Sequence, residues 1–356
     1  MINMFKVFKD WYKTHLTEPN QASFALIILF SIIILYVLVE TVAAILVAII
    51  LAYMLEGLVQ RLQDNIELER QLIVGIVYFF FIALSLILIF LLIPMMLDQL
   101  SVLIKSLPKM FEKGKEILIG TSETGAGLLS SEQVDNIFII LNSEMSSLGK
   151  SALTYSLSSA GDIFETIIYI FIVPILIFFI LYDKENIFSW FKKFFPEKLD
   201  LSKKASKELD LKIGNYIRCK FIEIIIVWSV SFIVFGALGL KYSLLLSFLC
   251  GISVIIPYIG AIAVTIPIIL VGYFQWGASS EFWYVIIGHL AIQLVDGNVV
   301  VPILFSDAVN IHPLAILIAI LFFGSIWGIW GVFFAIPLAV FLNTLINIWP
   351  ITKLES

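Results

Sequence analysis

The chain has 356 residues, of which 61% are hydrophobic and only 14% are charged, and its formal net charge is −5. Soluble domains contain about 45–50% apolar and about 25% charged residues, so a soluble fold could not bury this much apolar surface. The acidic balance also excludes a basic nucleic-acid-binding protein. Because the apolar stretches are continuous and do not alternate with polar residues, we expect an all-α, polytopic protein embedded in a lipid bilayer.

The first part of the chain alternates between apolar runs and charged stretches. A spanning helix needs about 20 apolar residues. On that basis we predict a cytoplasmic amphipathic segment (1–23), three transmembrane helices (24–96), an external amphipathic region (97–163), a fourth transmembrane helix (164–182) and cytoplasmic interfacial and connecting helices (183–220). We expect the third span, Leu72–Met96, to end near Pro94, because proline breaks helices.

The charges of the two extramembrane stretches predict the orientation. Residues 183–220 carry ten Lys or Arg against six acids, whereas residues 97–163 carry five Lys against eight acids. By the positive-inside rule the first stretch is cytoplasmic and the second is external. Two external segments, Leu100–Leu107 and Val134–Ala152, have one apolar face each. They are expected either to pack on each other or the membrane, or to form a subunit contact or gate.

The remaining apolar core, residues 221–350, precedes a short tail at residues 351–356. Between Cys219 and Pro350 only six residues are charged, and Glu223 and Asp296 are the candidates for burial at depth. An ionised group at the centre of a spanning helix costs about 2.5–3.5 kcal/mol on insertion scales. We therefore expect these two carboxylates to face a cavity, a partner or a transport path.

Asp296 lies in a segment that is unsuited to a lipid-facing helix. Gln293 and Asn298 add two amides, while Gly297 and Pro302 should interrupt the helical hydrogen-bond ladder. A broken helix with a carboxylate and amides is how transporters build a polar solute or ion site. The alternative is a polar patch whose groups are satisfied between helices.

A second break, Pro257-Tyr258-Ile259-Gly260, separates the apolar arms Ser243–Ile255 and Ile262–Phe274. Each arm is short for a span, so this stretch is either a re-entrant hairpin or two full helices joined by a tight turn. With these elements we expect about eight transmembrane helices in all, plus the hairpin and the amphipathic extramembrane helices.

Two weaker signals follow. The glycines of Gly324-x-x-x-Gly328 and Gly331 allow helices to approach closely. His289 and His312 lie near the breaks, where a structural hydrogen bond is the commoner role of a histidine and proton coupling the rarer one.

The sequence contains no metalloprotease His-Glu-x-x-His, no Gly-x-Ser-x-Gly, no P-loop and no Rossmann glycine motif. Cys219 and Cys250 lie in separate apolar runs, and the three histidines do not cluster. We therefore expect no enzyme activity, no catalytic residues, no metal site and no cofactor.

A series of motifs follows in fixed order over the second half of the chain. They are Tyr216-Ile-Arg218, Gly239-Leu-Lys-Tyr242-Ser-Leu-Leu-Leu, Ile256-Pro257-Tyr258-Ile259-Gly260, Gln293-x-x-Asp296-x-Asn298-x-x-x-Pro302, His312-Pro313-Leu314 and Gly324-x-x-x-Gly328-x-x-Gly331-x-x-x-Ala335-Ile-Pro337-Leu. In this order and spacing they resemble the AI-2E transporter family, which includes the bacterial exporters of autoinducer-2. Three positions depart from the family pattern: Ala261 stands for a frequent Pro, Asp296 for a common Glu, and Ser325 for a frequent Gly.

The resemblance implies a multi-pass protein of the bacterial plasma (inner) membrane. With the predicted topology, both termini are cytoplasmic. Family members are expected to form homo-oligomers, for which a pentamer is one arrangement. They are associated with export of a small polar signalling molecule, and some with Na⁺(Li⁺)/H⁺ antiport.

The leading hypothesis is a secondary transporter that exports a small polar molecule such as an autoinducer-2-like signal. Its solute or ion site would comprise Pro257, Tyr258, Gly260, Gln293, Asp296, Asn298, Pro302, Glu223, Arg218 and His312. Asp296 would bind a proton or cation, the two amides would hydrogen-bond the solute, and Arg218 would lie at the cytoplasmic mouth. The first alternative is a Na⁺(Li⁺)/H⁺ antiporter that uses Asp296 and Glu223, and the second is a non-transporting membrane scaffold built on the external helices.

Overall fold

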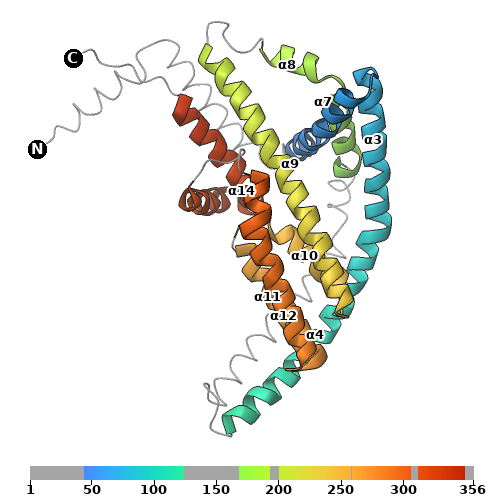
Figure 1. The fold of residues 1–356 in the computed structure, drawn as a ribbon, viewed down its shortest axis with the longest axis vertical. Helices are drawn as coiled ribbons and strands as arrows, with labels where there is room; N and C mark the ends of the chain where they lie inside the picture. Colours follow the sequence, from blue (N-terminus) through green and yellow to red (C-terminus); the bar gives the residue numbers. More distant parts are fainter. Residues whose placement is uncertain (1–43, 124–167, 193–199, 258, 306–311, 349–356) are drawn as a thin grey trace, which may run out of the picture. The chain divides into compact units, whose positions relative to one another are not determined.

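The computed structural model describes residues 44–123, 168–192, 200–257, 259–305 and 312–348. Figure 1 shows the elements in chain order, and within these ranges all of them are helical. The predicted all-α class is therefore confirmed. The first predicted span and the external helix expected at Val134–Ala152 lie outside the described residues.

The elements of the first half begin with a helix, Ala44–Asn65. It is followed by α3 (Arg70–Ile87), the π-helical turn η1 (Leu88–Leu92), α4 (Ile93–Glu123), the π-helical turn η2 (Ile168–Ile172), α7 (Val173–Tyr182) and α8 (Lys184–Lys192). The second half contains α9 (Asp200–Ala237), α10 (Ser243–Ser253), α11 (Ile259–Trp276), α12 (Ser280–Val295), the π-helical turn η3 (Asp296–Val300), α13 (Val301–Phe305) and α14 (Pro313–Ile348).

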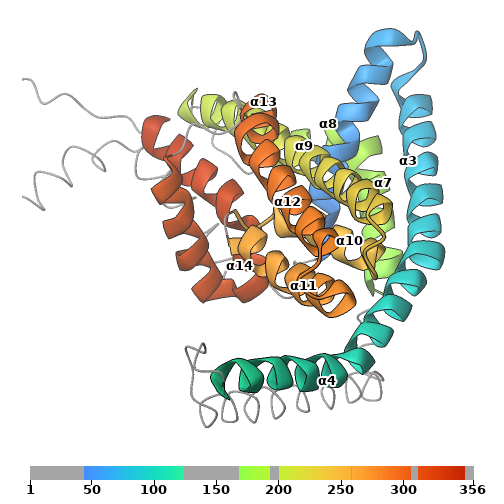
Figure 2. The same ribbon diagram turned by 60° about the horizontal axis from the view of Figure 1, so that its bottom comes forward.

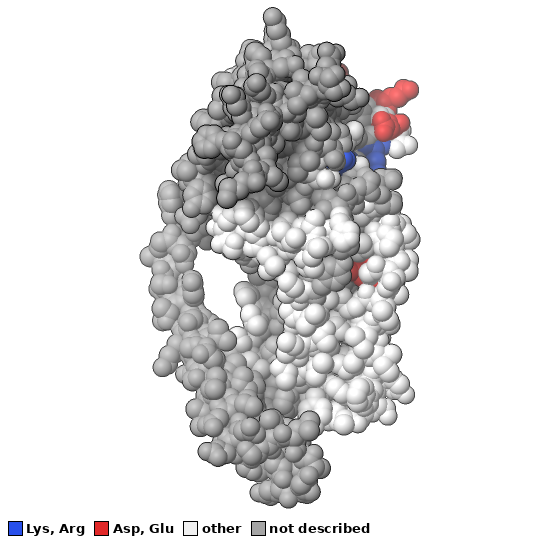
Figure 3. Space-filling model, turned by 90° about the vertical axis from the view of Figure 1, so that its left-hand side faces the viewer, with Lys and Arg blue, Asp and Glu red and all other residues white. Residues whose placement is uncertain are grey.

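Five helical stretches in the described residues are long and apolar enough to cross a membrane. They are Ala44–Asn65, Arg70–Met110, Leu211–Ala237, Ile259–Trp276 and Ser280–Phe305. Large apolar side chains such as Phe79 and Phe90 are 76% and 75% exposed on them. Most of the described atoms on the face in Figure 3 also belong to uncharged residues. An apolar surface of this kind is suited to lipid rather than water, and the chain is a polytopic membrane protein.

Each π-helical turn in the described residues is followed two positions later by a proline. Pro94 follows η1, Pro174 follows η2 and Pro302 follows η3. Proline lacks an N–H and its ring collides with the carbonyl oxygen four residues earlier. The widened turn, in which the Ile93 N–H donates to the Leu88 oxygen five residues back, lets the helix pass that point.

The predicted end of the third span near Pro94 is therefore wrong. The helix continues from α3 through η1 into α4 and passes a second proline, Pro108, before it ends at Glu123. The connecting helix predicted before residue 220 is likewise continuous with the fifth span, because α9 runs unbroken from Asp200 to Ala237. The difference at Pro94 arises because helices in apolar surroundings keep their internal hydrogen bonds wherever the backbone allows it. The continuity of α9 agrees with a connecting helix that leads into the fifth span.

The chain divides into two compact units. The first comprises Met1–Phe79, Ile172–Ile224 and Val295–Ser356, and the second comprises Phe80–Phe171 and Ile225–Leu294. The division cuts through α3, η2, α9 and the end of α12, so four continuous helical stretches contribute to both units.

In the second unit, α10 and α11 pack against each other as a hairpin. Only 11 residues form α10, about 16 Å of helix, which is too short to cross a membrane, whereas the 18 residues of α11 reach about 27 Å. At the tip the Gly260 N–H donates to the Ile256 oxygen. A Cβ at Gly260 would collide with the carbonyl oxygen of Ser253, so glycine permits this close approach.

In the first unit, α14 is folded on itself and forms a second hairpin, drawn in red in Figure 2. The fold occurs at Gly328, whose φ of 58° and ψ of −134° are not helical and favour glycine. A Cβ at Gly331 would collide with the carbonyl oxygen of Phe323, and one at Gly324 would lie 2.8 Å from Val332. The close approach predicted for this glycine cluster is confirmed.

Replacing Gly260 by Ala should destabilise the α10–α11 hairpin. The added methyl group must displace the Ser253 backbone, and overpacking of this kind costs about 1–3 kcal/mol. Gly236→Ala in α9 is the matched control, because its Cβ would meet nothing within 4 Å and alanine is the better helix former. Thermal loss of the monodisperse peak in detergent size-exclusion chromatography measures both variants. Equal melting temperatures would contradict the assignment of Gly260 as the close-contact residue.

Candidate functional site

Asp296 is the first residue of η3, the π-helical turn between α12 and α13. The predicted interruption of the helical ladder is present as a widened turn, in which the Val301 N–H donates to the Asp296 oxygen, and the helix does not unwind. Asp296 is 8% exposed, and its Oδ1 atom has no hydrogen-bond partner among the described residues. At 1.5 Å per residue it lies about 24 Å from the start of the helix at Ser280 and about 14 Å from the end at Phe305.

Glu223 of α9 is the other carboxylate expected at depth, and it is 2% exposed. The Lys220 Nζ atom lies 2.6 Å from its Oε2 atom. Lys220, Glu223 and Asp296 all belong to the first unit. The positive charge of Lys220 attracts both carboxylates, and the two carboxylates repel each other. One ammonium group is therefore shared by two buried carboxylates, which leaves one excess negative charge when both are ionised.

Aromatic side chains surround this charged group. The Lys220 Nζ atom lies 5.1 Å from the centroid of the Phe305 ring, within the range of a cation–π contact. The Phe305 ring in turn lies 5.7 Å from that of Tyr216, which belongs to a buried apolar cluster with Ile336 and Val340 of α14. Low polarity around the group strengthens the attraction between the ammonium and the carboxylates.

Arg218 lies two residues before Lys220 on α9 and contacts the helix Ala44–Asn65. Its Nε–H donates to the Tyr53 carbonyl oxygen at 3.3 Å. A Cβ at Gly57 would lie 2.9 Å from the Arg218 Cδ and Nε atoms, so the absence of a side chain there makes room for the arginine stem. The next residue, Cys219, donates its thiol proton to the Leu304 oxygen at the end of α13.

The other predicted site residues divide between the two units. Asn298 and Pro302 are exposed residues of η3 and α13 in the first unit. His312, also exposed, accepts a hydrogen bond from the Leu314 N–H at its Nδ1 atom. Gln293 belongs to the second unit, and its Nε2 atom is buried without a partner among the described residues.

The tip of the α10–α11 hairpin lies in the second unit as well. Pro257 is half-buried in the turn and Gly260 is buried at the start of α11. Tyr258 lies outside the described residues. Grouping this tip with Asp296 in one site therefore remains a prediction.

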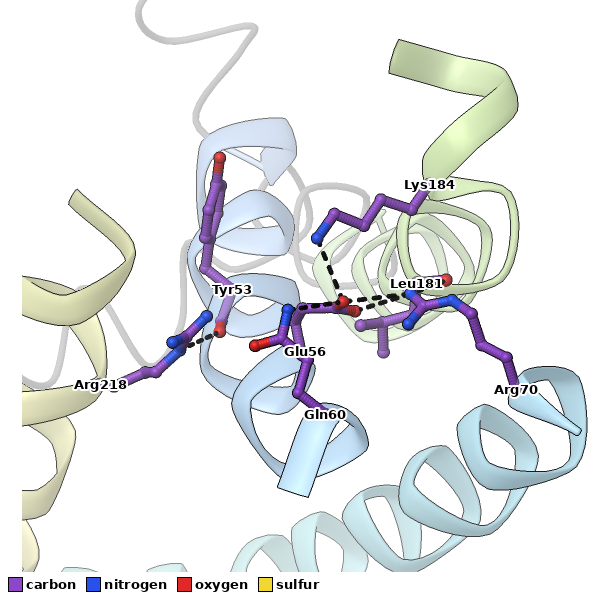
Figure 4. A network of polar contacts seen from close by, with 7 residues as sticks. All are labelled: Tyr53, Glu56, Gln60, Arg70, Leu181, Lys184 and Arg218. Atoms are coloured by element: carbon purple, nitrogen blue, oxygen red, sulfur yellow. Dashed lines mark hydrogen bonds and ion pairs between the residues drawn. The ribbon is translucent and has the colours of Figure 1, made fainter. Parts of the chain in front are cut away.

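The sequence analysis missed a polar network around Glu56, which is drawn in Figure 4. Glu56 is buried in the helix Ala44–Asn65, and its carboxylate accepts hydrogen bonds from Arg70 at 2.9 Å, from Lys184 at 3.1 Å and from Gln60 at 3.3 Å. Arg70 also donates to the Leu181 carbonyl oxygen. One carboxylate thus joins the starts of α3 and α8 to the first described helix.

No group of three or more His, Cys, Asp or Glu side chains in the described part of the chain could hold a metal ion. The geometry instead gives a helical membrane protein with charged side chains paired inside it. Such buried charges mark solute or ion pathways in membrane proteins.

Comparison with known proteins agrees with this class. The profile of AI-2E family transporters matches residues 24–351. The chain is 37% identical over 347 residues, 98% of each chain, to the Escherichia coli K12 protein named "Putative permease PerM". It is 28% identical over 207 residues to the Bacillus subtilis protein named "Putative transport protein YueF", covering 57% of this chain and 56% of that one. The chain therefore belongs to the AI-2E transporter family, whose members are bacterial multi-pass membrane transporters and not enzymes.

Replacing Glu56 by Gln should destabilise the first unit, because Arg70 and Lys184 lose their carboxylate. Breaking a fully buried ion pair costs about 3–5 kcal/mol, but both cations here are partly exposed, so we expect a loss of about 1–3 kcal/mol. SDS-driven unfolding in mixed micelles measures this change. Glu67→Gln, at an exposed position, is the control and should alter stability by less than about 0.5 kcal/mol. A Glu56 variant as stable as this control would contradict a structural role for the network.

Proposed function

We propose that this chain is a secondary transporter of the bacterial plasma membrane that exports a small polar solute, such as an autoinducer-2-like signal. A proton or monovalent cation bound at Asp296 is coupled to the movement of the solute. The proposal includes about eight spans, a homo-oligomeric assembly and cytoplasmic termini. The Escherichia coli relative, whose match covers 98% of this chain, is itself named "Putative permease PerM".

The observation that carries the proposal is the buried Asp296 carboxylate inside a long apolar helix, whose Oδ1 atom has no hydrogen-bond partner among the described residues. Its Oδ1 atom is buried, and Lys220 is already paired with Glu223 at 2.6 Å. A carboxylate in such surroundings is costly unless a proton or cation neutralises it. Because the group carries one excess negative charge, binding of one positive charge makes it neutral. Gain and loss of that charge is the ordinary basis of ion coupling in transporters.

The π-helical turn adds a reason to place the coupling here. Such turns occur frequently at functional sites, because the widened ladder re-aims the side chains around it. Asp296 is buried, whereas Gly297 and Asn298, next in the turn, are exposed. The turn therefore supports a carboxylate directed inward on a helix that otherwise presents apolar residues such as Ile303 outward.

Asp296→Asn should abolish solute transport by proteoliposomes while membrane insertion is unchanged. The amide keeps the shape of the side chain but cannot release a proton or carry the charge that holds a cation. Glu281→Gln is the matched control, because Glu281 lies on the same continuous helix at an exposed position. Transport at the wild-type rate by the Asp296 variant would remove Asp296 from the mechanism.

A specific observation also favours the antiporter alternative, namely that Glu223 and Asp296 act on each other and share Lys220. Two coupled carboxylates could exchange Na⁺ or Li⁺ for protons without any organic solute. An entrapped pH-sensitive dye tests this in proteoliposomes that carry an imposed proton gradient. Proton movement on addition of NaCl or LiCl alone, lost in Glu223→Gln, would establish the antiporter, whereas the exporter predicts no response until solute is present.

A further inference from the structure

The turn between α9 and α10 carries the motif Gly239-Leu-Lys-Tyr242, which the proposed function does not use. The Leu240 N–H donates to the Phe235 carbonyl oxygen at 2.9 Å and closes the end of α9. Helix α10 then begins directly after Tyr242, whose side chain makes no hydrogen bond to the start of that described helix. Helices prefer Ser, Thr, Asp, Asn or Gly at this position, because these residues satisfy the first N–H groups. The start of α10 therefore takes its partners from other helices.

Those partners are two glutamines of the second unit. Gln275 of α11 accepts from the Lys241 N–H through Oε1 and donates to the Gly239 carbonyl oxygen through Nε2, each at 2.8 Å. Gln99 of α4 accepts at its Oε1 atom, at 3.0 Å, from the N–H of Leu245, the third residue of α10. The amide orientations follow from the contacts, since a backbone N–H requires an acceptor and a carbonyl oxygen a donor.

The two glutamine contacts lie in different surroundings. Gly239 and Lys241 are exposed, so water can take the place of Gln275 there. Leu245 is 5% exposed and belongs to a buried apolar cluster with Met96 of α4. A buried N–H without an acceptor costs about 1–3 kcal/mol. The start of α10 therefore depends on Gln99 more than on Gln275.

Helix α4 is attached to the described part of the second unit mainly at this point. Apart from η1, which precedes it, α10 is the described helix that α4 packs against most extensively. Leu103, one turn beyond Gln99, is the furthest α4 residue in the apolar cluster. From there the helix runs on to Glu123, about 30 Å further. We call the segment from Gln99 to Glu123 the α4 arm.

The two helices of the α10–α11 hairpin are also tied to each other through α12. The Nε2 atom of the completely buried His289 lies 2.9 Å from the Thr265 Oγ1 atom of α11, and its Nδ1 atom lies 3.9 Å from the Cys250 Sγ atom of α10. The Thr265 hydroxyl donates to the Ala261 carbonyl oxygen, so it accepts from His289. A neutral imidazole then accepts from the Cys250 thiol. A displacement of α10 therefore carries α11 with it.

We propose that the α4 arm sets the position of the α10–α11 hairpin through the Gln99–Leu245 hydrogen bond. Gln99 is a positioning residue, because it supplies the cap that the sequence before α10 lacks. A load on the exposed arm is transmitted to the start of α10, and the His289 contacts pass it to α11. This device involves neither Asp296 nor an ion, so it does not rest on the proposed function.

Hydrogen–deuterium exchange of single amides in the full-length protein, held in lipid nanodiscs, tests the cap. Gln99→Met keeps the length of the side chain but has no oxygen, so the Leu245 amide should exchange about tenfold faster. Gln99→Glu keeps an acceptor and should restore slow exchange. Gln275→Met should leave the Leu245 amide unchanged. Asp98→Asn is the matched control, at an exposed position next to Gln99.

A load placed on the arm tests the transmission. Lys113 is exposed and lies beyond the apolar stretch that ends at Met110. Lys113→Cys can be biotinylated in a Cys219→Ser background, because the other cysteine, Cys250, is buried. Streptavidin bound there should change exchange of the Gly260 amide, at the tip of the hairpin, at least threefold. The same load should have no effect at Gly260 in Gln99→Met.

Three results would overturn the proposal. They are exchange of the Leu245 amide in Gln99→Met within about twofold of the wild type, an equal response to streptavidin with and without the Gln99 acceptor, and no response in either protein. Melting temperatures in the same nanodiscs show whether Gln99→Met folds. If it does not, Gln99→Asn decides, because it remains polar but is one methylene too short to keep the bond to Leu245.

Discussion

Placing a charge inside an apolar protein is costly, and the paired charges of the first unit show how the structure meets this constraint. Glu56 is neutralised by Arg70 and Lys184, and Glu223 by Lys220. The Glu56 pairs join separate helices, whereas the Lys220–Glu223 pair lies within one turn of α9. The packing of the first unit therefore depends on where these charges lie. Asp296 differs, because its buried Oδ1 atom has no hydrogen-bond partner among the described residues. A buried carboxylate oxygen without a hydrogen-bond partner lowers stability, and in the proposed function ion binding is what retains it.

Composition and apolar run length predicted much of the fold. They gave the helical class and the apolar stretches, and the glycine spacing gave the close approach at Gly324 and Gly331 but not the one at Gly260. The predicted break at Pro94 was wrong because proline excludes only the regular hydrogen bonds between residues four apart. In the π-helical turn before it, the N–H groups bond to carbonyl oxygens five residues back, so the helix continues. No local pattern distinguishes a proline that ends a helix from one that the helix passes in this way.

Candidate site residues were predictable only where their chemistry conflicts with their surroundings. Asp296 and Glu223 stand out because they interrupt apolar runs. Glu56, in contrast, lies among other polar residues near a helix end, where a solvated charge is the usual expectation, and its partner Lys184 is 128 positions away. The Trp228 and Ser231 side chains, whose buried Nε1 and Oγ atoms have no hydrogen-bond partner among the described residues, give no signal either, because both residue types are common in spanning helices. Their unsatisfied state becomes visible only when the neighbouring helices are in place.

The polar groups of the two units differ in charge. The group in the first unit is charged, and in the proposed function one proton or cation neutralises it. The Cys250–His289–Thr265 contacts of the second unit involve no formal charge when the imidazole is neutral. A continuous helix still connects the two units here, since Gln293 and Asp296 are three residues apart on either side of the α12–η3 junction. In the proposed mechanism, a change in the π-helical turn when Asp296 gains or loses its positive charge reaches Gln293, one of the two amides predicted to bind the solute, directly through the backbone. Coupling then requires no contact between the ion and the solute.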